Sequence, residues 1–137
     1  MNTEEDIVIR VRGLRTQFGS HVLHDGLELD VRRGEVMAVV GGSGTGKSVL
    51  LNTIIGLIHQ AAGTIEILGE DTAQVNSQEA KQLKSRWGVL FQAGALFSSL
   101  TVSQNIQVPM KEFTDLSQDM INELTALKVS LVGLRLW

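Results

Sequence analysis

The segment spanning residues 41–48 constrains the fold of this chain more than any other, because it fits the pattern G-x-x-x-x-G-K-[ST] of a phosphate-binding loop. Its residues are Gly41, Gly42, Ser43, Gly44, Thr45, Gly46, Lys47 and Ser48. Apolar runs lie directly before it, at residues 36–40, and directly after it, at residues 49–55. The first run predicts a short buried parallel strand and the second predicts a buried helix. Strand, loop and helix in this order are the context in which such a loop binds phosphate.

Each residue type in the loop suits an anion. Glycine has no Cβ, so its backbone reaches the positive φ angles at which successive N–H groups can converge on one phosphate. A helix that begins between residues 45 and 47 adds free N–H donors and the positive end of its dipole. Lys47 supplies a mobile charge for the outer phosphates, and the hydroxyl of Ser48 can ligate Mg²⁺. The alternative, a glycine-rich hairpin turn that contains Lys-Ser by chance, does not account for the flanking apolar runs.

The composition limits the kinds of protein this chain can be. With 137 residues, 43% of them hydrophobic, it is long enough for one domain with a core. Its net charge of −3 is spread along the sequence, which excludes nucleic acid as the main partner. It contains no cysteine, which excludes disulfides and thiolate chemistry and suits a reducing compartment. Because the N-terminus is acidic and no apolar stretch approaches ~20 residues, we expect neither signal peptide nor membrane span, and a cytoplasmic protein.

Alternating apolar residues predict antiparallel strands near the N-terminus. The pattern runs over residues 7–14 and again within residues 22–31. A short third strand is expected at residues 63–70, where glycines bound an apolar run. Residues 87–91 are mostly apolar and predict a second buried strand.

Helices are expected over much of the remaining chain. A polar helix is predicted over residues 77–86. Thr101 and Gln104 have the spacing of a helix-capping box, and Pro109 is expected to interrupt the segment that follows. Apolar residues at positions 121, 124, 127, 129 and 131 then form a partly helical pattern.

The order of these motifs resembles the nucleotide-binding domain of ABC transporters over essentially the whole chain. Besides the loop, the matching segments are Phe18-Gly19, Leu29-Asp30-Val31-Arg32-Arg33-Gly34-Glu35, Gly63-Thr64-Ile65 and Val89-Leu90-Phe91-Gln92. Residues 91–97 and 101–114 resemble most closely the Mla-type phospholipid-transport ATPases of Gram-negative bacteria. The resemblance implies an α/β P-loop NTPase fold of the ABC type, truncated, in three parts. These are an antiparallel β subdomain over residues 1–35, a core running to the Q-loop over 36–92, and the start of a helical subdomain over 93–137.

The resemblance also implies a nucleotide site for ATP and Mg²⁺. Phe18 takes the position of the aromatic residue that stacks on adenine, and residues 41–48 take that of the phosphate loop. Gln92 lies at the Q-loop position, where its side-chain oxygen would ligate Mg²⁺ together with Ser48. Without the resemblance, Phe18 is interpreted as a packed turn residue and Gln92 as a solvated residue at a strand end.

The implied partners are an integral-membrane permease and a second ATP-binding subunit in a homodimer. The apolar segment Ala95-Leu96-Phe97 is interpreted either as a surface facing that permease or as a small core cluster. The protein would then lie in the cytoplasm, peripheral on the inner face of the bacterial inner membrane. It would energise transport of a phospholipid or a related lipid.

Hydrolysis in this family requires motifs that the chain does not contain. No apolar strand ending in Asp-Glu and no Leu-Ser-Gly-Gly-type signature follows Ser48. The histidines are His21, His24 and His59, so none stands in the position of a switch histidine downstream of the signature. We therefore expect no catalytic residue in this chain, with Lys47 and Gln92 in supporting roles, and ATP binding without turnover. The missing strand would leave an apolar strand edge open, which predicts poor solubility.

Two other functions stay open at this point. One is a truncated, non-catalytic nucleotide-binding fragment, either a pseudogene product or one half of a divided domain. The other is a small-molecule kinase built on a phosphate loop, although such an enzyme needs several arginines and only Arg86 and Arg135 follow the loop. A GTPase is excluded because neither Asp-x-x-Gly nor Asn-Lys-x-Asp occurs in the sequence.

Overall fold

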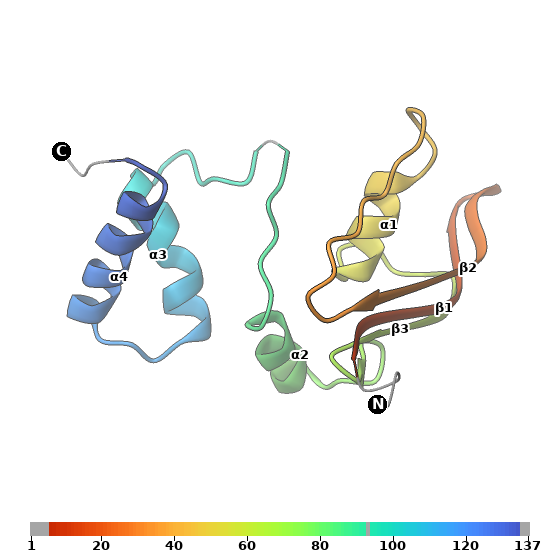
Figure 1. The fold of residues 1–137 in the computed structure, drawn as a ribbon, viewed down its shortest axis with the longest axis horizontal. Coiled ribbons are helices and arrows are strands. Elements are labelled where there is room, and N and C mark those ends of the chain that lie inside the picture. Colours follow the sequence, from red (N-terminus) through yellow and green to blue (C-terminus); the bar gives the residue numbers. More distant parts are fainter. Residues whose placement is uncertain (1–5, 93, 135–137) are drawn as a thin grey trace. The chain divides into compact units, whose positions relative to one another are not determined.

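The computed structural model describes residues 6–92 and 94–134, and the chain divides into two compact units between residues 80 and 81. The first unit contains β1 (Ile7–Phe18), β2 (His21–Arg32), α1 (Lys47–Ile54), β3 (Ala62–Ile67) and β4 (Glu70–Asp71) (Figure 1). The second unit contains α3 (Val102–Phe113) and α4 (Gln118–Leu131), and α2 (Ser77–Lys84) spans the boundary. Residues 1–5, on which the expectation about a signal peptide partly rests, Ala93 of the Q-loop segment and residues 135–137 lie outside the described residues.

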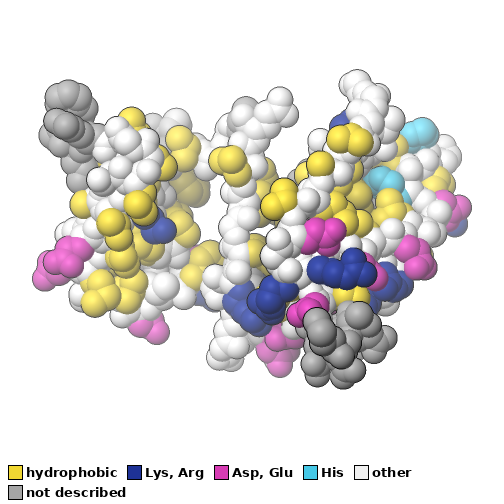
Figure 2. All heavy atoms as spheres, in the orientation of Figure 1, with side chains coloured by type: hydrophobic (Ala, Val, Ile, Leu, Met, Phe, Trp, Pro, Cys, Tyr) yellow, Lys and Arg dark blue, Asp and Glu magenta, His cyan; other side chains and the backbone are white. Residues whose placement is uncertain are grey.

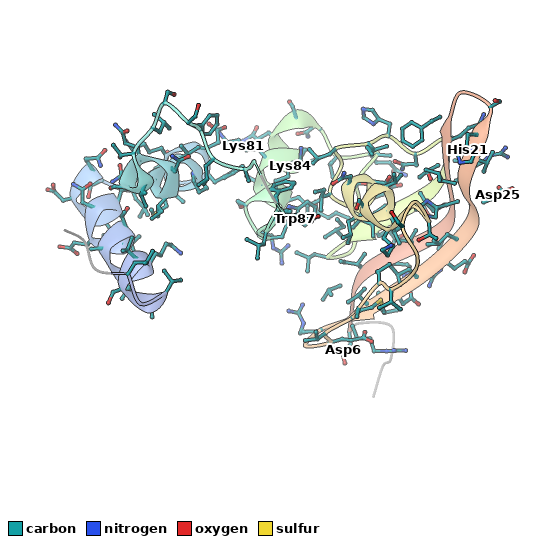
Figure 3. All side chains as sticks on the ribbon, turned by 90° about the horizontal axis from the view of Figure 1, so that it is seen from above. Asp6, His21, Asp25, Lys81, Lys84 and Trp87 are labelled. Carbon is teal, nitrogen blue, oxygen red and sulfur yellow. The ribbon has the colours of Figure 1, made fainter. Side chains whose placement is uncertain are left out.

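The sheet of the first unit has the strand order β2-β1-β3-β4, and every pair in it is antiparallel. This confirms the antiparallel strands predicted from the alternating pattern. β1 lies at its centre, because Val11 is opposite Leu29 on one side and opposite Ile65 on the other. Val11, Leu14 and Ile65 are almost fully buried and form the apolar core. The β1–β2 hairpin extends well beyond this core and carries His21 and Asp25 near its turn (Figure 3).

Charged residues on the sheet are paired across strands. Arg12 donates a hydrogen bond of 2.8 Å to the carboxylate of Asp30 on the neighbouring strand. This bond lowers the pKa of Asp30 and raises the pKa of Arg12. Arg10 forms a similar ion pair of 3.5 Å with Glu66 on β3. The two pairs join β1 to β2 and β1 to β3 across the sheet.

Two segments predicted as buried strands do not form strands. Residues 35–40 and 87–91 lack regular secondary structure, and within residues 6–92 and 94–134 no strand pairs with either segment. Their apolar side chains reach the surface instead: Val36 is 98% exposed and Leu90 is 100% exposed. An extended segment becomes a strand only when a neighbour supplies hydrogen-bond partners, and an apolar sequence does not by itself provide that neighbour.

The predicted helices all form, with one correction. The capping box at Thr101 is confirmed, since its side chain accepts from the N–H of Gln104 while the Gln104 side chain accepts from the Thr101 N–H. Pro109 does not interrupt the segment, because α3 continues through it to Phe113. A proline in a helix interior removes one hydrogen bond but does not always end the helix when its other contacts persist.

The two helices of the second unit pack through a mixed contact. Gln107 of α3 is buried and donates a 3.1 Å hydrogen bond to Asn122 of α4. Met110, Ile121 and Val129 supply the apolar part of this small core. No helix within residues 6–92 and 94–134 is both long and apolar enough to cross a bilayer.

Candidate phosphate-binding site

The glycine-rich loop ends in a left-handed turn from which α1 begins. Gly44 has a φ of 79° and Gly46 a φ of 91°, so two of the four loop glycines use the backbone freedom for which glycine was expected there. Gly46 is the N-cap residue of α1 and provides no side-chain cap for it. The helix begins at Lys47, inside the interval predicted from the sequence. Its first N–H groups therefore have no partner from a cap and point out of the helix end.

The loop is held in shape by its own polar side chains. The ammonium group of Lys47 donates hydrogen bonds of 2.8 Å to the carbonyl of Gly41 and 2.5 Å to that of Gly42. The hydroxyl of Thr45 donates a 2.9 Å bond to the same Gly42 carbonyl. These bonds hold the ammonium group of Lys47 beside the carbonyls of Gly41 and Gly42. They also connect the first residues of the loop to its last ones. The arrangement is preorganised to place one cation next to free backbone donors.

Close packing explains two of the glycines that the loop contains. A Cβ on Gly41 would lie 3.0 Å from the Thr45 hydroxyl oxygen, so a side chain there would push against the bond that closes the loop. A Cβ on Gly46 would lie 2.8 Å from the Nε2 atom of His24, which belongs to β2. At these two positions the loop lies close to itself and to β2, while residues 41–45 stay exposed.

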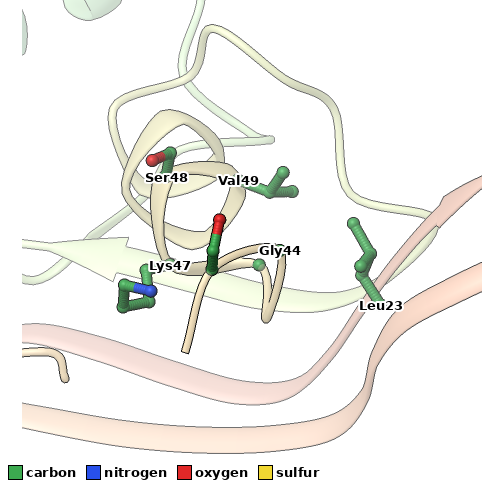
Figure 4. Close-up of a pocket in the computed structure, with 7 residues that line it drawn as sticks. Leu23, Gly44, Lys47, Ser48 and Val49 are labelled. Atoms are coloured by element: carbon green, nitrogen blue, oxygen red, sulfur yellow. The ribbon is translucent and has the colours of Figure 1, made fainter. Parts of the chain in front are cut away.

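A pocket of about 260 Å³ opens at the loop. It is lined by Leu23, Ser43, Gly44, Gly46, Lys47, Ser48 and Val49. Leu23 projects from β2 toward the loop, on the opposite side of the pocket from Lys47 (Figure 4). Ligand pockets commonly measure ~300–1,000 Å³, so this one has the size for part of a nucleotide rather than the whole of it.

The structure brings together most of the loop residues singled out from the sequence. Five of them line the pocket, and Gly41, Gly42 and Thr45 form the bonded frame behind it. Phe18 stands at the end of β1 and is 49% exposed, and it is not among the pocket's lining residues. Gln92 belongs to the other compact unit and is exposed. The roles of Phe18 and Gln92 stay predictions.

The segment Ala95-Leu96-Phe97 is exposed rather than packed in a core. Leu96 is 75% exposed, and Phe97 is 59% exposed. The backbone of Phe97 exchanges two hydrogen bonds with the side chain of Asn105, which fixes this segment against the start of α3. Of the two interpretations made from the sequence, the exposure favours a surface over a core cluster.

Two apolar residues of the pocket and one polar neighbour were not identified from the sequence. Leu23 and Val49 contribute apolar walls, and His24 touches the loop at Gly46. Val49 directly follows the phosphate-loop pattern, so its place could have been found by extending that pattern by one residue. Nothing in the sequence places Leu23 or His24 beside the loop, because they come from a strand that precedes it by about twenty residues.

The comparisons with known proteins agree on the family. Residues 24–133 match the profile of the family described as "ABC transporter". The chain is 39% identical over 128 residues to the "probable ribonucleotide transport ATP-binding protein mkl" of Mycobacterium leprae, a match that covers 93% of this chain and 37% of that protein. It is 35% identical over 128 residues to the "intermembrane phospholipid transport system ATP-binding protein MlaF" of Haemophilus influenzae, covering 93% of this chain and 48% of that protein. The chain therefore spans less than half the length of either relative.

A solved structure shows the same fold. The "ATP-binding cassette MJ0796", determined as a dimer in a post-hydrolysis state with ADP and Pi, superimposes with a TM-score of 0.80. The match covers 93% of this chain and 58% of that one at 21% identity. This similarity confirms the α/β fold of the ABC type that the sequence predicts.

Proposed function

This chain belongs to the ABC transporter family, and from that premise we propose that it binds the phosphate chain of ATP as the nucleotide-binding part of a transporter's ATP-binding subunit. The observation that carries the proposal is the pocket at the start of α1. Ser43, Gly44, Gly46, Lys47 and Ser48 line it, next to an N-terminal helix end without a side-chain cap. A site with this charge and these donors suits an anion.

Binding follows from how the loop distributes charge. The N–H groups at the start of α1 and the dipole of the helix attract the phosphate oxygens. The Lys47 ammonium, already held on the inner side of the loop by two carbonyl groups, contacts the outer phosphates by a short side-chain movement. Leu23 and Val49 line the pocket with apolar side chains, which would shield these contacts from water when the phosphates are bound.

Mg²⁺ fits the donors that the chain offers for it. The hydroxyl of Ser48 is a hard oxygen ligand of the kind that Mg²⁺ prefers and would hold the ion, and the resemblance at the Q-loop position implies a second such ligand in the amide oxygen of Gln92. When bound, the ion neutralises charge on the phosphates. Phe18 would stack on the adenine. Its ring is exposed at the end of β1, so a base can reach it.

The proposed cellular role is to energise transport at a membrane. The partners would be an integral-membrane permease and a second ATP-binding subunit, with the chain on the cytoplasmic face of the inner membrane. The dimeric ATP-binding cassette of the same fold supports the second partner. The exposed surface at Leu96 and Phe97 offers a contact for the permease. Phospholipid is the cargo we favour, because of the Mla-type pattern at residues 91–97 and the likeness to the Haemophilus phospholipid transport protein.

The chain alone is proposed to bind ATP without hydrolysing it. Phosphoryl transfer needs an acidic residue to hold the metal and another group to orient the attacking water. The acidic residues after Ser48 are Glu66, Glu70, Asp71, Glu79, Glu112, Asp115, Asp119 and Glu123, and none forms an Asp-Glu pair at the end of an apolar run. As a single chain it would act as a non-catalytic nucleotide-binding fragment.

The test is titration of the purified chain with a fluorescent ATP analogue in the presence of Mg²⁺. Lys47→Ala should weaken binding about thirtyfold, since a hydrogen bond to a charged group contributes ~1.5–3 kcal/mol. Lys84→Ala is the matched control, because Lys84 is an exposed lysine at the end of α2, and it should leave the affinity unchanged. Equal affinity of Lys47→Ala and the parent chain would refute phosphate binding at the loop. Steady phosphate release that Lys47→Ala abolishes would refute the absence of hydrolysis.

A further inference from the structure

His24 of β2 connects the interior of the sheet to the phosphate loop. Its Nδ1 atom forms a hydrogen bond of 2.6 Å with the hydroxyl of Thr16 on β1, and Thr16 is fully buried. The opposite edge of the same ring faces the loop. A Cβ placed on Gly46 would lie 2.8 Å from Nε2 and 2.9 Å from Cε1, so the imidazole occupies the space directly beside this glycine.

The residue that His24 touches determines how α1 begins. Gly46 is the N-cap of the helix and has a φ of 91°, and Lys47 and Ser48 follow it in the pocket lining. A small rotation at Gly46 would redirect the first N–H groups of α1 and move both side chains. Gly46 has no side chain that could limit such a rotation, so the His24 ring beside it adds a restraint to the bonds that Lys47 and Thr45 make within the loop.

The bond to Thr16 makes the ring a defined support rather than loose packing. A histidine ring that pivots about its χ2 angle presents different atoms to its neighbour. A hydrogen bond to a fully buried hydroxyl holds one orientation, because breaking it would leave a buried polar group unsatisfied. Thr16, His24 and Gly46 thereby link β1, β2 and the loop.

We propose that His24 is a positioning residue for nucleotide binding, which fixes the left-handed turn at Gly46 and with it the direction of the donors at the start of α1. This inference rests on the proposed binding of ATP phosphates at the loop. His24 acts through Gly46 and does not line the pocket itself. The side chains that support a binding site contribute by holding its geometry to within a fraction of an ångström.

The experiment measures the dissociation constant of the fluorescent ATP analogue and the unfolding temperature for the same set of variants of the full chain. His24→Ala should weaken binding about tenfold, because the loop loses its support. Thr16→Val keeps the shape of the side chain but removes the hydroxyl, and it should weaken binding about fivefold. Thr16→Ser keeps the hydroxyl and should restore most of that loss. His21→Ala, on the same hairpin but exposed, is the matched control and should bind like the parent.

A double-mutant comparison tests whether His24 acts through Gly46. Gly46→Ala should reduce affinity more in the parent than in His24→Ala, because removal of the ring frees space for the added methyl group. If the two losses are equal, His24 does not act through this contact. If His24→Ala lowers only the unfolding temperature and leaves the affinity intact, its ring is structural packing and the proposal is wrong.

Nucleotide binding by the parent chain distinguishes a failure of the proposed function from a failure of the role of His24. A parent chain that binds no nucleotide contradicts the proposed function, and the role of His24 with it. A parent chain that binds, with a His24→Ala variant that binds equally well, contradicts the role of His24 alone. Should His24→Ala fail to fold by circular dichroism, the contrast between Thr16→Val and Thr16→Ser decides the question.

Discussion

Gly63 lies within β3 and Gly69 lies two residues after its end, and both have a left-handed backbone, with φ angles of 92° and 85°. Their surroundings differ. A Cβ on Gly63 would lie 2.6 Å from the backbone carbonyl oxygens of both Arg12 and Gly13 on β1, whereas nothing lies within 4 Å of a Cβ on Gly69. Gly63 is therefore required both for its φ angle and for the close approach of two strands.

Substituting each glycine by alanine should separate these two effects. Gly69→Ala is expected to cost ~1–2 kcal/mol of the free energy of unfolding, the strain of a left-handed alanine. Gly63→Ala should cost ~1–3 kcal/mol more, because the backbone of β1 must move to admit the methyl group. Urea unfolding followed by circular dichroism measures both values. Equal losses for the two variants would show that the approach at Gly63 is not a close contact.

The residues of the phosphate loop could be predicted from the sequence, but the contact of His24 with that loop could not. The pattern from Gly41 to Ser48 sets the local backbone, and the helix start at Lys47 follows from it. The contact between His24 and Gly46 joins residues 22 positions apart, and only the pairing of β1 with β2 and the folding of the loop onto that sheet create it. Sequence patterns report neighbours along the chain, and such contacts depend on tertiary packing.

Among the elements, α3 contains the clearest local conflict. Pro109 lies within the helix and has no N–H to donate to the carbonyl of Asn105, one turn earlier. Two features offset the hydrogen bond that is lost at Pro109. The capping box of Thr101 and Gln104 stabilises the start of the helix, and the buried side chains of Gln107 and Met110 stabilise its packing. These contacts explain why the helix continues where the sequence predicts an interruption.

Replacing Pro109 by alanine should therefore stabilise α3. The gain in the free energy of unfolding is expected to reach up to ~3 kcal/mol, the cost of proline in a helix interior. Thr101→Ala should lower the free energy of unfolding by ~1 kcal/mol, because the backbone N–H of Gln104 loses the hydroxyl that caps it. Thermal unfolding monitored at the helical circular dichroism signal measures both. A lower unfolding temperature for Pro109→Ala would mean that its ring provides packing that outweighs the missing bond.

For the whole molecule, each of the two compact units has an exposed apolar segment that forms no strand with the described residues. Val36 and Val40 before the loop, and Val89, Leu90 and Phe91 in the other unit, are all exposed. Hydrophobic side chains reach the surface in several places on the face seen in Figure 2. Extended apolar backbone with unused N–H and C=O groups is a template for pairing with another chain.

The isolated chain should consequently self-associate. Light scattering after size-exclusion chromatography is expected to show oligomers at micromolar concentration. Val36→Lys and Leu90→Lys together should shift the chain toward monomer, because a charge on each extended segment opposes pairing. Leu57→Lys is the control, since Leu57 is an exposed leucine outside both segments and its substitution should have a smaller effect. A parent chain that is monomeric throughout this range would contradict the expectation.

The sequence by itself determined the family, the phosphate loop, the antiparallel strands and the helices. Each of these depends on residues close together in the chain: a glycine pattern, an alternation, a cap. Tertiary structure decided what the sequence could not. Residues 36–40 and 87–91 have the composition of buried strands, yet they pair with no strand in the part of the chain that the structure describes, because a strand forms only when another segment supplies its hydrogen bonds. The phosphate loop likewise depends on a residue that is distant in the sequence, because the ring of His24 lies directly beside Gly46.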